Sequence, residues 1–186
     1  MPTQFDSEHI ASLRRDARRF VEQVSDQEDR ALALLAVEDI NVASRSPARL
    51  LITASTQQAV ETLARRIHAS GPRAQCPFVM TSAGELPIDA QALRDSCRRF
   101  LDAAAGGSVL VSAVEDMPAA VQEALSDLLA GLESPPRPSA AVRLISGTTV
   151  SLLDRVAAGT FSARLLYRLN IIHLWAGAGP PEVTLT

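Results

Sequence analysis

The sequence predicts an α/β protein with one parallel sheet that helices cover on both faces. Five short apolar segments, the candidate strands, alternate along the chain with segments in which apolar residues recur at helical spacing. Such an alternation is typical of parallel sheets, whose strands are joined by helices. We find no internal repeat and no long linker. The 186 residues are therefore expected to fold as one domain with a substantial core.

Two helices are expected before the first strand. Residues 6–24 place apolar side chains on one side and four arginines on the other, which is typical of a solvated basic face. The alternative for that face is a phosphate or an acidic partner. The sequence SDQE at residues 25–28 has the form of a capping box and predicts a second helix over about residues 27–43. Residues 1–48 are thus expected to form an N-terminal helical segment packed on the core.

Residues 50–68 predict a buried strand, a turn and an amphipathic helix. The strand is the apolar run at residues 50–52, and four apolar residues then follow at helical spacing: Val60, Leu63, Ala64 and Ile67. Nucleotide-binding proteins place a phosphate loop in such a turn, and that loop needs glycines and a lysine. Residues 54–60 contain neither, and the 18 basic residues of the chain are all arginine. The sequence therefore predicts the scaffold of a nucleotide site without its chemistry, and we expect residues 54–59 to be closed or helical.

The remaining elements follow the same alternation. Ser70-Gly71-Pro72 is a stop signal for the first core helix, and Gly106-Gly107 is another for the helix that precedes the third strand. Later strands are expected at residues 76–81, 108–114, 142–147 and 170–175. Helices are expected at residues 90–104, from 117 onward, at 152–158 and at 160–169. A proline-rich loop at 134–139 and a flexible tail at 177–186 complete the chain.

Composition excludes several classes of function. A net charge of -3 gives no reason to expect direct DNA binding, and no apolar run approaches the length of a membrane span. The N-terminus lacks the apolar core of a signal peptide, so we expect a cytoplasmic protein. The two cysteines have no metal-like spacing, and the pair Glu115-Asp116 has no second acidic group at ligand spacing. No metal site is therefore expected.

Other polar and aromatic residues are expected to be structural. Asp116 follows the third strand and is expected to cap the next helix. His68 ends a helix as a capping or solvated residue, whereas His173 in an apolar strand is expected to be a satisfied core histidine. Tyr167 and Trp175 are expected to be packing residues.

Five segments between residue 49 and about residue 175 carry a resemblance to a known family. They are LLITASTQQAVETLARRIH, PRAQCPFV, GGSVLVSAVEDMPAAVQEALSDLL, VRLISGTT and GTFSARLLYRLNIIHL. In this order and at this spacing they resemble the AAA+ core of bacterial sigma-54-dependent transcription activators (enhancer-binding proteins). The resemblance implies a three-layer P-loop NTPase-like sandwich with a five-stranded parallel sheet and a degenerate AAA+ core at residues 49–176. The chain stops soon after the fifth strand, so no helical lid subdomain is expected.

The chain differs from this family at the catalytic positions. The glycines and the lysine of the family's phosphate loop fall on Ala54, Gln57, Ala59 and Val60. The Walker B Asp-Glu pair falls on Ser112 and Ala113. In the family the Asp holds magnesium and the Glu polarises the attacking water, which Ser and Ala do not do. The resemblance therefore implies no ATP hydrolysis, no nucleotide cofactor and no metal ion.

The sensor and the arginine-finger helix are altered as well. The sensor Asn falls on Thr149, and the first of two finger arginines falls on Ser162. The second is retained as Arg168. In the family the matching arginine reaches across a subunit boundary, which makes Arg168 the candidate interaction residue. The alternative, which we favour, is a local role in which Arg168 pairs with an acidic side chain or caps carbonyls before the last strand.

Three functions remain open from the sequence. The first is a pseudo-ATPase that serves as a protein-interaction or regulatory module in bacterial transcription or signalling, with itself or an active AAA+ relative as partner. The family's Gly-Ala-Phe-Thr-Gly-Ala loop for sigma-54 is missing, and no helix-turn-helix is expected. The second is a domain that still binds a nucleotide or another small anion, without hydrolysis, at the helix starting near Gln57, assisted by Arg65 or Arg66. The third is an enzyme of unrelated chemistry, for which no catalytic constellation is visible.

Overall fold

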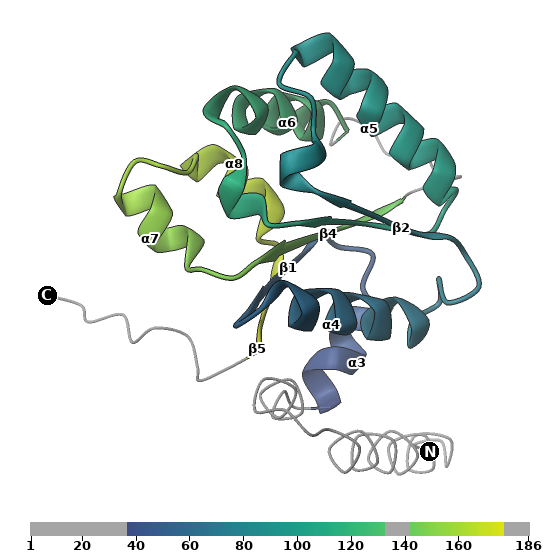
Figure 1. Cartoon of the computed structure of the whole chain (residues 1–186). Coiled ribbons are helices and arrows are strands. Elements are labelled where there is room, and N and C mark those ends of the chain that lie inside the picture. Colours follow the sequence, from purple (N-terminus) through teal and green to yellow (C-terminus); the bar gives the residue numbers. More distant parts are fainter. Residues whose placement is uncertain (1–36, 133–141, 177–186) are drawn as a thin grey trace, which may run out of the picture.

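A parallel five-stranded sheet forms the centre of the computed structural model, which describes residues 37–132 and 142–176 (Figure 1). The strand order is β2-β3-β4-β1-β5, and every neighbouring pair is parallel. The strands are β1 (Leu50–Ala54), β2 (Phe78–Ser82), β3 (Ser108–Ser112), β4 (Arg143–Thr148) and β5 (Ile172–Ala176). The predicted fold class, an α/β sandwich on a five-stranded parallel sheet, is confirmed.

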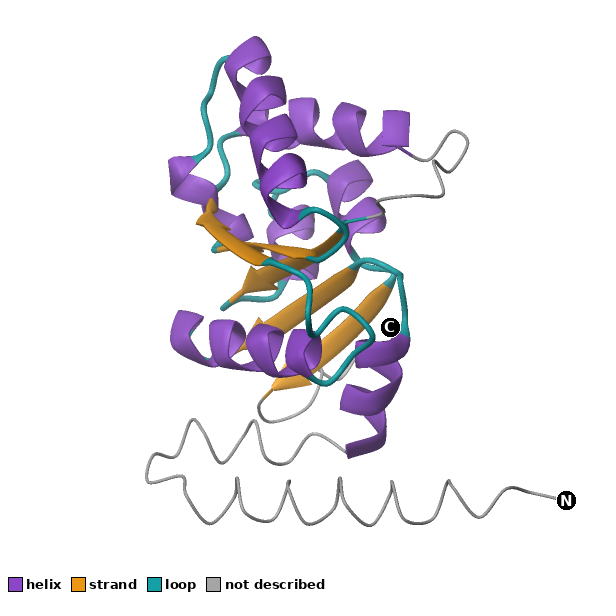
Figure 2. Ribbon diagram, turned by 90° about the vertical axis from the view of Figure 1, so that its right-hand side faces the viewer, coloured by secondary structure: helices purple, strands orange, loops and turns teal. Residues whose placement is uncertain are grey.

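Helices cover both faces of this sheet. They are α3 (Val37–Arg45), α4 (Gln57–Ala69), α5 (Ala90–Ala104), α6 (Ala119–Leu132), α7 (Leu152–Ala157) and α8 (Ala163–Leu169). Two short 3₁₀ turns, η1 (Ala83–Glu85) and η2 (Val114–Asp116), follow β2 and β3. Figures 1 and 2 show α3 and α4 on one face and the other four helices on the opposite face. The central strands are buried on both faces and have no solvent-exposed side, so helices must cover both faces of the sheet.

The expected elements after residue 49 are all present, with ends that differ by a few residues. The helix expected over 27–43 is described only from Val37, as α3. The helix expected at 6–24, the loop at 134–139 and the tail at 177–186 lie outside the described residues. None of the helices in the described part of the chain is long and apolar enough to cross a membrane.

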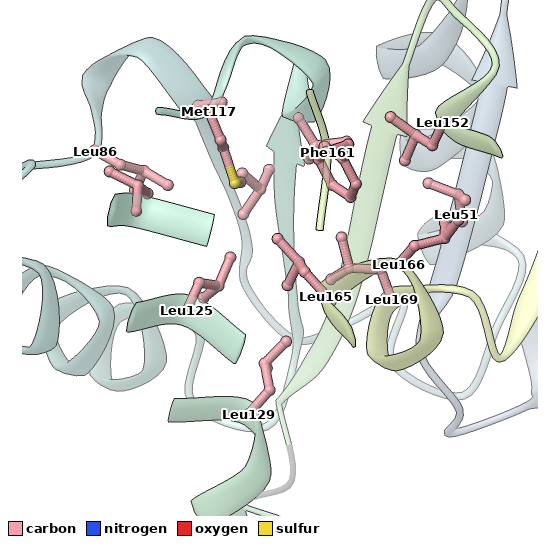
Figure 3. Packing of buried hydrophobic residues seen from close by; sticks show 14 of the residues in the cluster. Leu51, Leu86, Met117, Leu125, Leu129, Leu152, Phe161, Leu165, Leu166 and Leu169 are labelled. Carbon is pink, nitrogen blue, oxygen red and sulfur yellow. The ribbon is translucent and has the colours of Figure 1, made fainter. Parts of the chain in front are cut away.

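Two apolar clusters form the core, one on each face of the sheet. Every residue of β1 and of β3 is buried, so alternate side chains of these strands enter opposite clusters. On the α3–α4 side, Ile52 and Val60 are fully buried. On the other side, Leu51 packs with Leu165 and Leu169 of α8 (Figure 3). Full burial of one such leucine contributes about 1.5–3 kcal/mol, so the central strands fix the relative positions of the helices.

His68 is a buried structural residue, which corrects the expectation of a capping or solvated histidine. Its side chain is 7% exposed, and its ring nitrogens lie 3.0 Å from Ser108 Oγ and 3.0 Å from the Cys76 carbonyl oxygen. Since a carbonyl only accepts, Nε2 carries the proton and Nδ1 accepts from the Ser108 hydroxyl. Burial lowers the pKa of His68; the hydrogen bond to the Cys76 carbonyl raises it in part, and the positive charges of Arg73 and Arg143 lower it again. The ring therefore joins α4 to β3 in its neutral form.

Two other expectations are wrong. Asp116 is exposed and ends η2, while the carbonyl of Pro118 accepts the first hydrogen bonds of α6 from Val121 and Gln122. Pro118 therefore starts the helix that Asp116 was expected to cap. Tyr167 was expected to be a packing residue, but it is 80% exposed on α8.

Candidate functional site

The turns that follow β1, β3 and β4 meet at the carboxyl edge of the sheet. These three strands are neighbours and run in parallel, so their carboxyl ends lie side by side. In open α/β sheets, ligands bind outside this edge. Ser112 ends β3, Thr149 follows β4 and Gln57 begins the helix after β1, and these three residues are among the positions expected to be altered. The carboxyl edge is therefore the candidate site.

The turn after β1 is closed. Only two residues separate the end of β1 from Gln57, where α4 begins. Thr56 is the N-cap: its Oγ1 accepts from the Ala59 amide at 3.2 Å, and its carbonyl accepts from the Val60 amide at 3.1 Å. The expectation that residues 54–59 would be closed or helical is confirmed. The backbone here forms a capped helix start instead of a loop wrapped around a ligand.

The residue at the position where the resemblance places a lysine, Val60, lies in the core. Val60 is fully buried, and it packs against Gly147 of β4. A Cβ atom added to Gly147 would lie 2.2 Å from Val60 Cγ1, so the two residues fit only because position 147 has no side chain. Ala54 and Ala59 are buried beside them. Three of the four altered phosphate-loop residues thus serve α4–sheet packing.

The Walker B positions have structural contacts as well. Ser112 is buried, and its Oγ donates to the Thr81 carbonyl of the neighbouring strand at 3.4 Å. Ala113 adopts the left-handed conformation, with φ 54° and ψ 43°. Because this conformation is disfavoured for a residue with a Cβ atom, it marks a sharp change of chain direction. The chain then enters η2, which carries Glu115.

Glu115 connects the three turns. Its Oε1 accepts from the Thr149 amide at 2.8 Å, from Thr149 Oγ1 at 2.7 Å and from Gln57 Nε2 at 3.4 Å. The structure therefore brings together two altered positions, Gln57 and Thr149, through a residue that the sequence analysis had considered only as a metal ligand. The signal was available: Glu115 follows β3 and Thr149 follows β4, and these strands are neighbours.

The site offers acceptors and negative charge. Glu115 Oε2 and Gln57 Oε1 are both buried, and neither has a hydrogen-bond partner among the described residues. Both atoms accept hydrogen bonds, so the arrangement favours a donor or a cation over a phosphate oxygen. In the described part of the chain, no group of three or more His, Cys, Asp or Glu side chains could hold a metal ion.

Arg65 and Arg66 lie at the wrong end of α4 to assist an anion at Gln57. Arg65 lies eight positions after Gln57 in the helix, which corresponds to about 12 Å along the axis. The Arg65 guanidinium lies over the Phe78 ring, 5.5 Å from its centroid. Arg66 belongs to the last turn of α4. The assistance expected from these arginines is therefore not available at the start of the helix.

Arg168 lies near the amino edge of the sheet, opposite the candidate site. It belongs to the last turn of α8, and its side chain is half-buried. Its carbonyl accepts from Arg49 Nη1 at 3.1 Å, and Arg49 directly precedes β1. The structure does not bring Arg168 together with Gln57, Glu115 and Thr149.

His173 lies on the edge strand β5, beside β1. Its Nε2 lies 2.8 Å from Thr53 Oγ1, and its ring stacks on Trp175 with centroids 4.7 Å apart. Burial lowers the pKa of His173 to about 4. His173 is half-buried and lies outside both core clusters, so the expectation of a satisfied core histidine holds for the hydrogen bond to Thr53 and not for the burial, whereas Trp175 packs as expected.

Acidification should therefore weaken the fold through His173. Its folded pKa of about 4 is below the unfolded value of 6.5, so the unfolded chain binds the proton first as the pH falls from 6.5 to 4. For this partly exposed ring we expect a loss of about 1–2 kcal/mol between pH 7 and pH 4.5. Denaturant titrations at both pH values measure it, with His173→Gln as the control that lacks this contribution. An equal loss in both proteins would contradict the assignment.

Comparison with known proteins gives the same family from sequence and from structure. Residues 32–175 match the model of the sigma-54 interaction domain family. The response regulator protein PilR of Pseudomonas aeruginosa is 30% identical over 150 residues, which are 70% of this chain and 34% of PilR. This chain spans about a third of the length of the curated relatives it matches.

Two solved structures are similar in fold. NtrX from Brucella abortus in complex with ATP matches with a TM-score of 0.63 at 24% identity, over 91% of this chain and 42% of NtrX. The P-loop NTPase domain of the sigma-54 transport activator from E. coli matches with a TM-score of 0.51 at 25% identity. That match covers 70% of this chain and 97% of the solved domain.

Proposed function

This chain belongs to the sigma-54 interaction domain family, and we propose that it is a non-catalytic member, a pseudo-ATPase that acts through protein contacts. The observation that carries the proposal is the contact of Glu115 with Thr149 and Gln57 at the carboxyl edge of the sheet. A site for phosphoryl transfer supplies positive charge and a metal ion at this place. Here the carboxylate at this place, Glu115, is engaged by Thr149 and Gln57, and no lysine accompanies it.

Electrostatics supports this proposal. Two unit charges of like sign about 4 Å apart repel by roughly 4 kcal/mol at an effective dielectric constant of about 20. A phosphate beside Glu115 would meet this repulsion, and the chain has no lysine to offset it. At the start of α4, the Ala59 amide already donates to Thr56 Oγ1, so it is not available to a phosphate. Hydrolysis depends on the positioning of the phosphate and on stabilisation of its charge, and this site provides neither.

The proposed role is that of an interaction or regulatory module in bacterial transcription or signalling within the cytoplasm. Its partner would be a second copy of the chain or an active AAA+ relative. This part of the proposal rests on the retained family fold, which can present a family-type assembly surface when the nucleotide chemistry is lost. It also rests on relatives whose names, such as PilR and NtrC, describe response and transcriptional regulators.

Two measurements on the purified chain test the proposal. ATP turnover should stay at background with or without magnesium, and calorimetry with ATP, ADP and cyclic dinucleotides should show no binding tighter than about 100 μM, which is some 5–6 kcal/mol. Size-exclusion chromatography with light scattering, alone and with a purified active AAA+ member from the same cell, should show a complex. Turnover that disappears in Thr149→Val would contradict the non-catalytic assignment, and a lone monomer in every mixture would contradict the interaction role.

Substitution of Arg168 separates its two candidate roles. For the local role, which we favour, Arg168→Ala should lower the free energy of unfolding by roughly 1–3 kcal/mol and leave association unchanged. The matched control is Arg164→Ala on the same helix. Arg164 forms an exposed ion pair with Asp127 at 2.9 Å, which is worth about 0–1 kcal/mol. Loss of the complex in Arg168→Ala at unchanged stability would instead assign Arg168 to an interface.

A further inference from the structure

We propose, on the basis of the proposed function, that Glu115 is the residue that makes this site reject phosphate ligands. Its carboxylate acts as an internal anion: it occupies the donors that a bound anion would use, and it holds together the turns after β1 and β4. A neutral residue at position 115 should therefore open the site to phosphate groups. The proposal rests on three features of the contact.

The first feature is the set of donors on Glu115 Oε1. A backbone N–H and a hydroxyl from Thr149 and a side-chain amide from Gln57 converge on this one oxygen, at 2.7–3.4 Å. Backbone N–H groups and hydroxyls at strand ends are the donors that anion sites use. The carboxylate therefore satisfies an arrangement that would otherwise suit an external anion.

The second feature is the second oxygen. Glu115 Oε2 and Gln57 Oε1 are buried acceptors without a hydrogen-bond partner among residues 37–132 and 142–176. A phosphate oxygen that reached them would find two more acceptors and a like charge. Replacement of the carboxylate by an amide removes the charge and turns one of these acceptors into a donor.

The third feature is that the backbone directs Glu115 toward the site, whereas the neighbouring Asp116 is exposed to solvent. After the left-handed Ala113, the Asp116 amide donates to the Ala113 carbonyl at 3.0 Å, and the Met117 amide donates to the Val114 carbonyl at 3.3 Å. This 3₁₀ turn holds Glu115 toward Thr149 while Asp116 is exposed to solvent. Two adjacent acidic residues thus differ in their surroundings, which provides a matched control.

The test compares the wild-type chain with Glu115→Gln and Asp116→Asn. Both variants lose one negative charge within one turn, but only Glu115→Gln removes the charge of the internal anion. Its amide oxygen still accepts from Thr149, so Glu115→Ser, which also frees these donors, should bind the anion at least as tightly. Calorimetry at low salt, with inorganic pyrophosphate and with ATP as probes, should give Glu115→Gln an affinity at least tenfold above the wild-type limit. Its melting temperature should rise with pyrophosphate concentration. Asp116→Asn should match the wild type in both measurements.

Equal anion binding by Glu115→Gln and Asp116→Asn would overturn the inference. If Glu115→Gln does not fold, Glu115→Ser carries the same expectation, because it is neutral and leaves the Thr149 amide open. Glu115→Asp keeps the charge, so a gain of pyrophosphate affinity in this variant would also overturn the inference. The proposed function fails by a different result, which is ATP hydrolysis by the wild-type chain. If the wild-type chain does not hydrolyse ATP and none of the variants binds pyrophosphate or ATP, only the role of Glu115 is overturned.

Discussion

Replacement of Val60 by lysine, the residue expected at this position from the resemblance, should destabilise the fold by about 3–5 kcal/mol instead of rebuilding a phosphate site. Val60 is fully buried in the cluster between α4 and the sheet. A lysine there would begin among the apolar side chains of this cluster and would have to bring its ammonium group out through them. The ion would either lose its hydration or force α4 away from β4, and both outcomes weaken the core.

Two further variants separate the charge from the added volume. Val60→Met has a similar length without the charge and should lose only about 1–3 kcal/mol through overpacking. Gln58→Lys adds the same charge at an exposed position of the same helix, with an expected effect below about 1 kcal/mol. Denaturant unfolding followed by far-UV circular dichroism measures all three. Wild-type stability in Val60→Lys would show that the side chain reaches solvent, and the closed description of this turn would then be wrong.

The elements with strong local signals were predictable from the sequence. Helix α5 spans Ala90–Ala104, the same residues as the prediction, because Asp89 caps its start and a glycine pair follows its end. The Asp89 carboxylate accepts from the Ala92 amide at 2.8 Å. Strand β3 was expected to continue to residue 114 but ends at Ser112, because Ala113 takes a left-handed conformation. Apolar character alone gives no sign of that turn.

The contact of Glu115 was not predicted because it depends on sheet order. Glu115 and Thr149 are 34 positions apart in the chain, and they meet only because β3 and β4 are neighbours. The sequence analysis judged the acidic pair by the spacing of metal ligands, a local criterion that gives no information on this contact. The burial of His68 has the same origin, since its partner Ser108 is 40 positions away. Residues defined by contacts between neighbouring strands require the topology before they can be identified.

The close approach of α4 to β4 leads to the second large effect. Gly147→Ala should destabilise the fold by about 2–3 kcal/mol, because the new methyl group would lie 2.2 Å from Val60 Cγ1. Valine is branched at Cβ and stiff, so its methyl group has little freedom to move aside. Either the helix shifts outward or the strand bends, and both changes disturb the fully buried packing around Ile52 and Ile145.

A double-mutant cycle with Val60→Ala isolates this contact. Val60→Ala alone should lose about 2 kcal/mol, because it removes two buried methyl groups and leaves a cavity. In the double variant the alanine at position 147 enters the space that the valine has left. The two losses should therefore not add, and the interaction free energy should be about 1–3 kcal/mol in the stabilising direction. Additive losses would show that the strand moves to relieve Gly147→Ala. In that case position 60 would have room for a longer side chain, and the large effect expected for Val60→Lys would have to come from its charge alone.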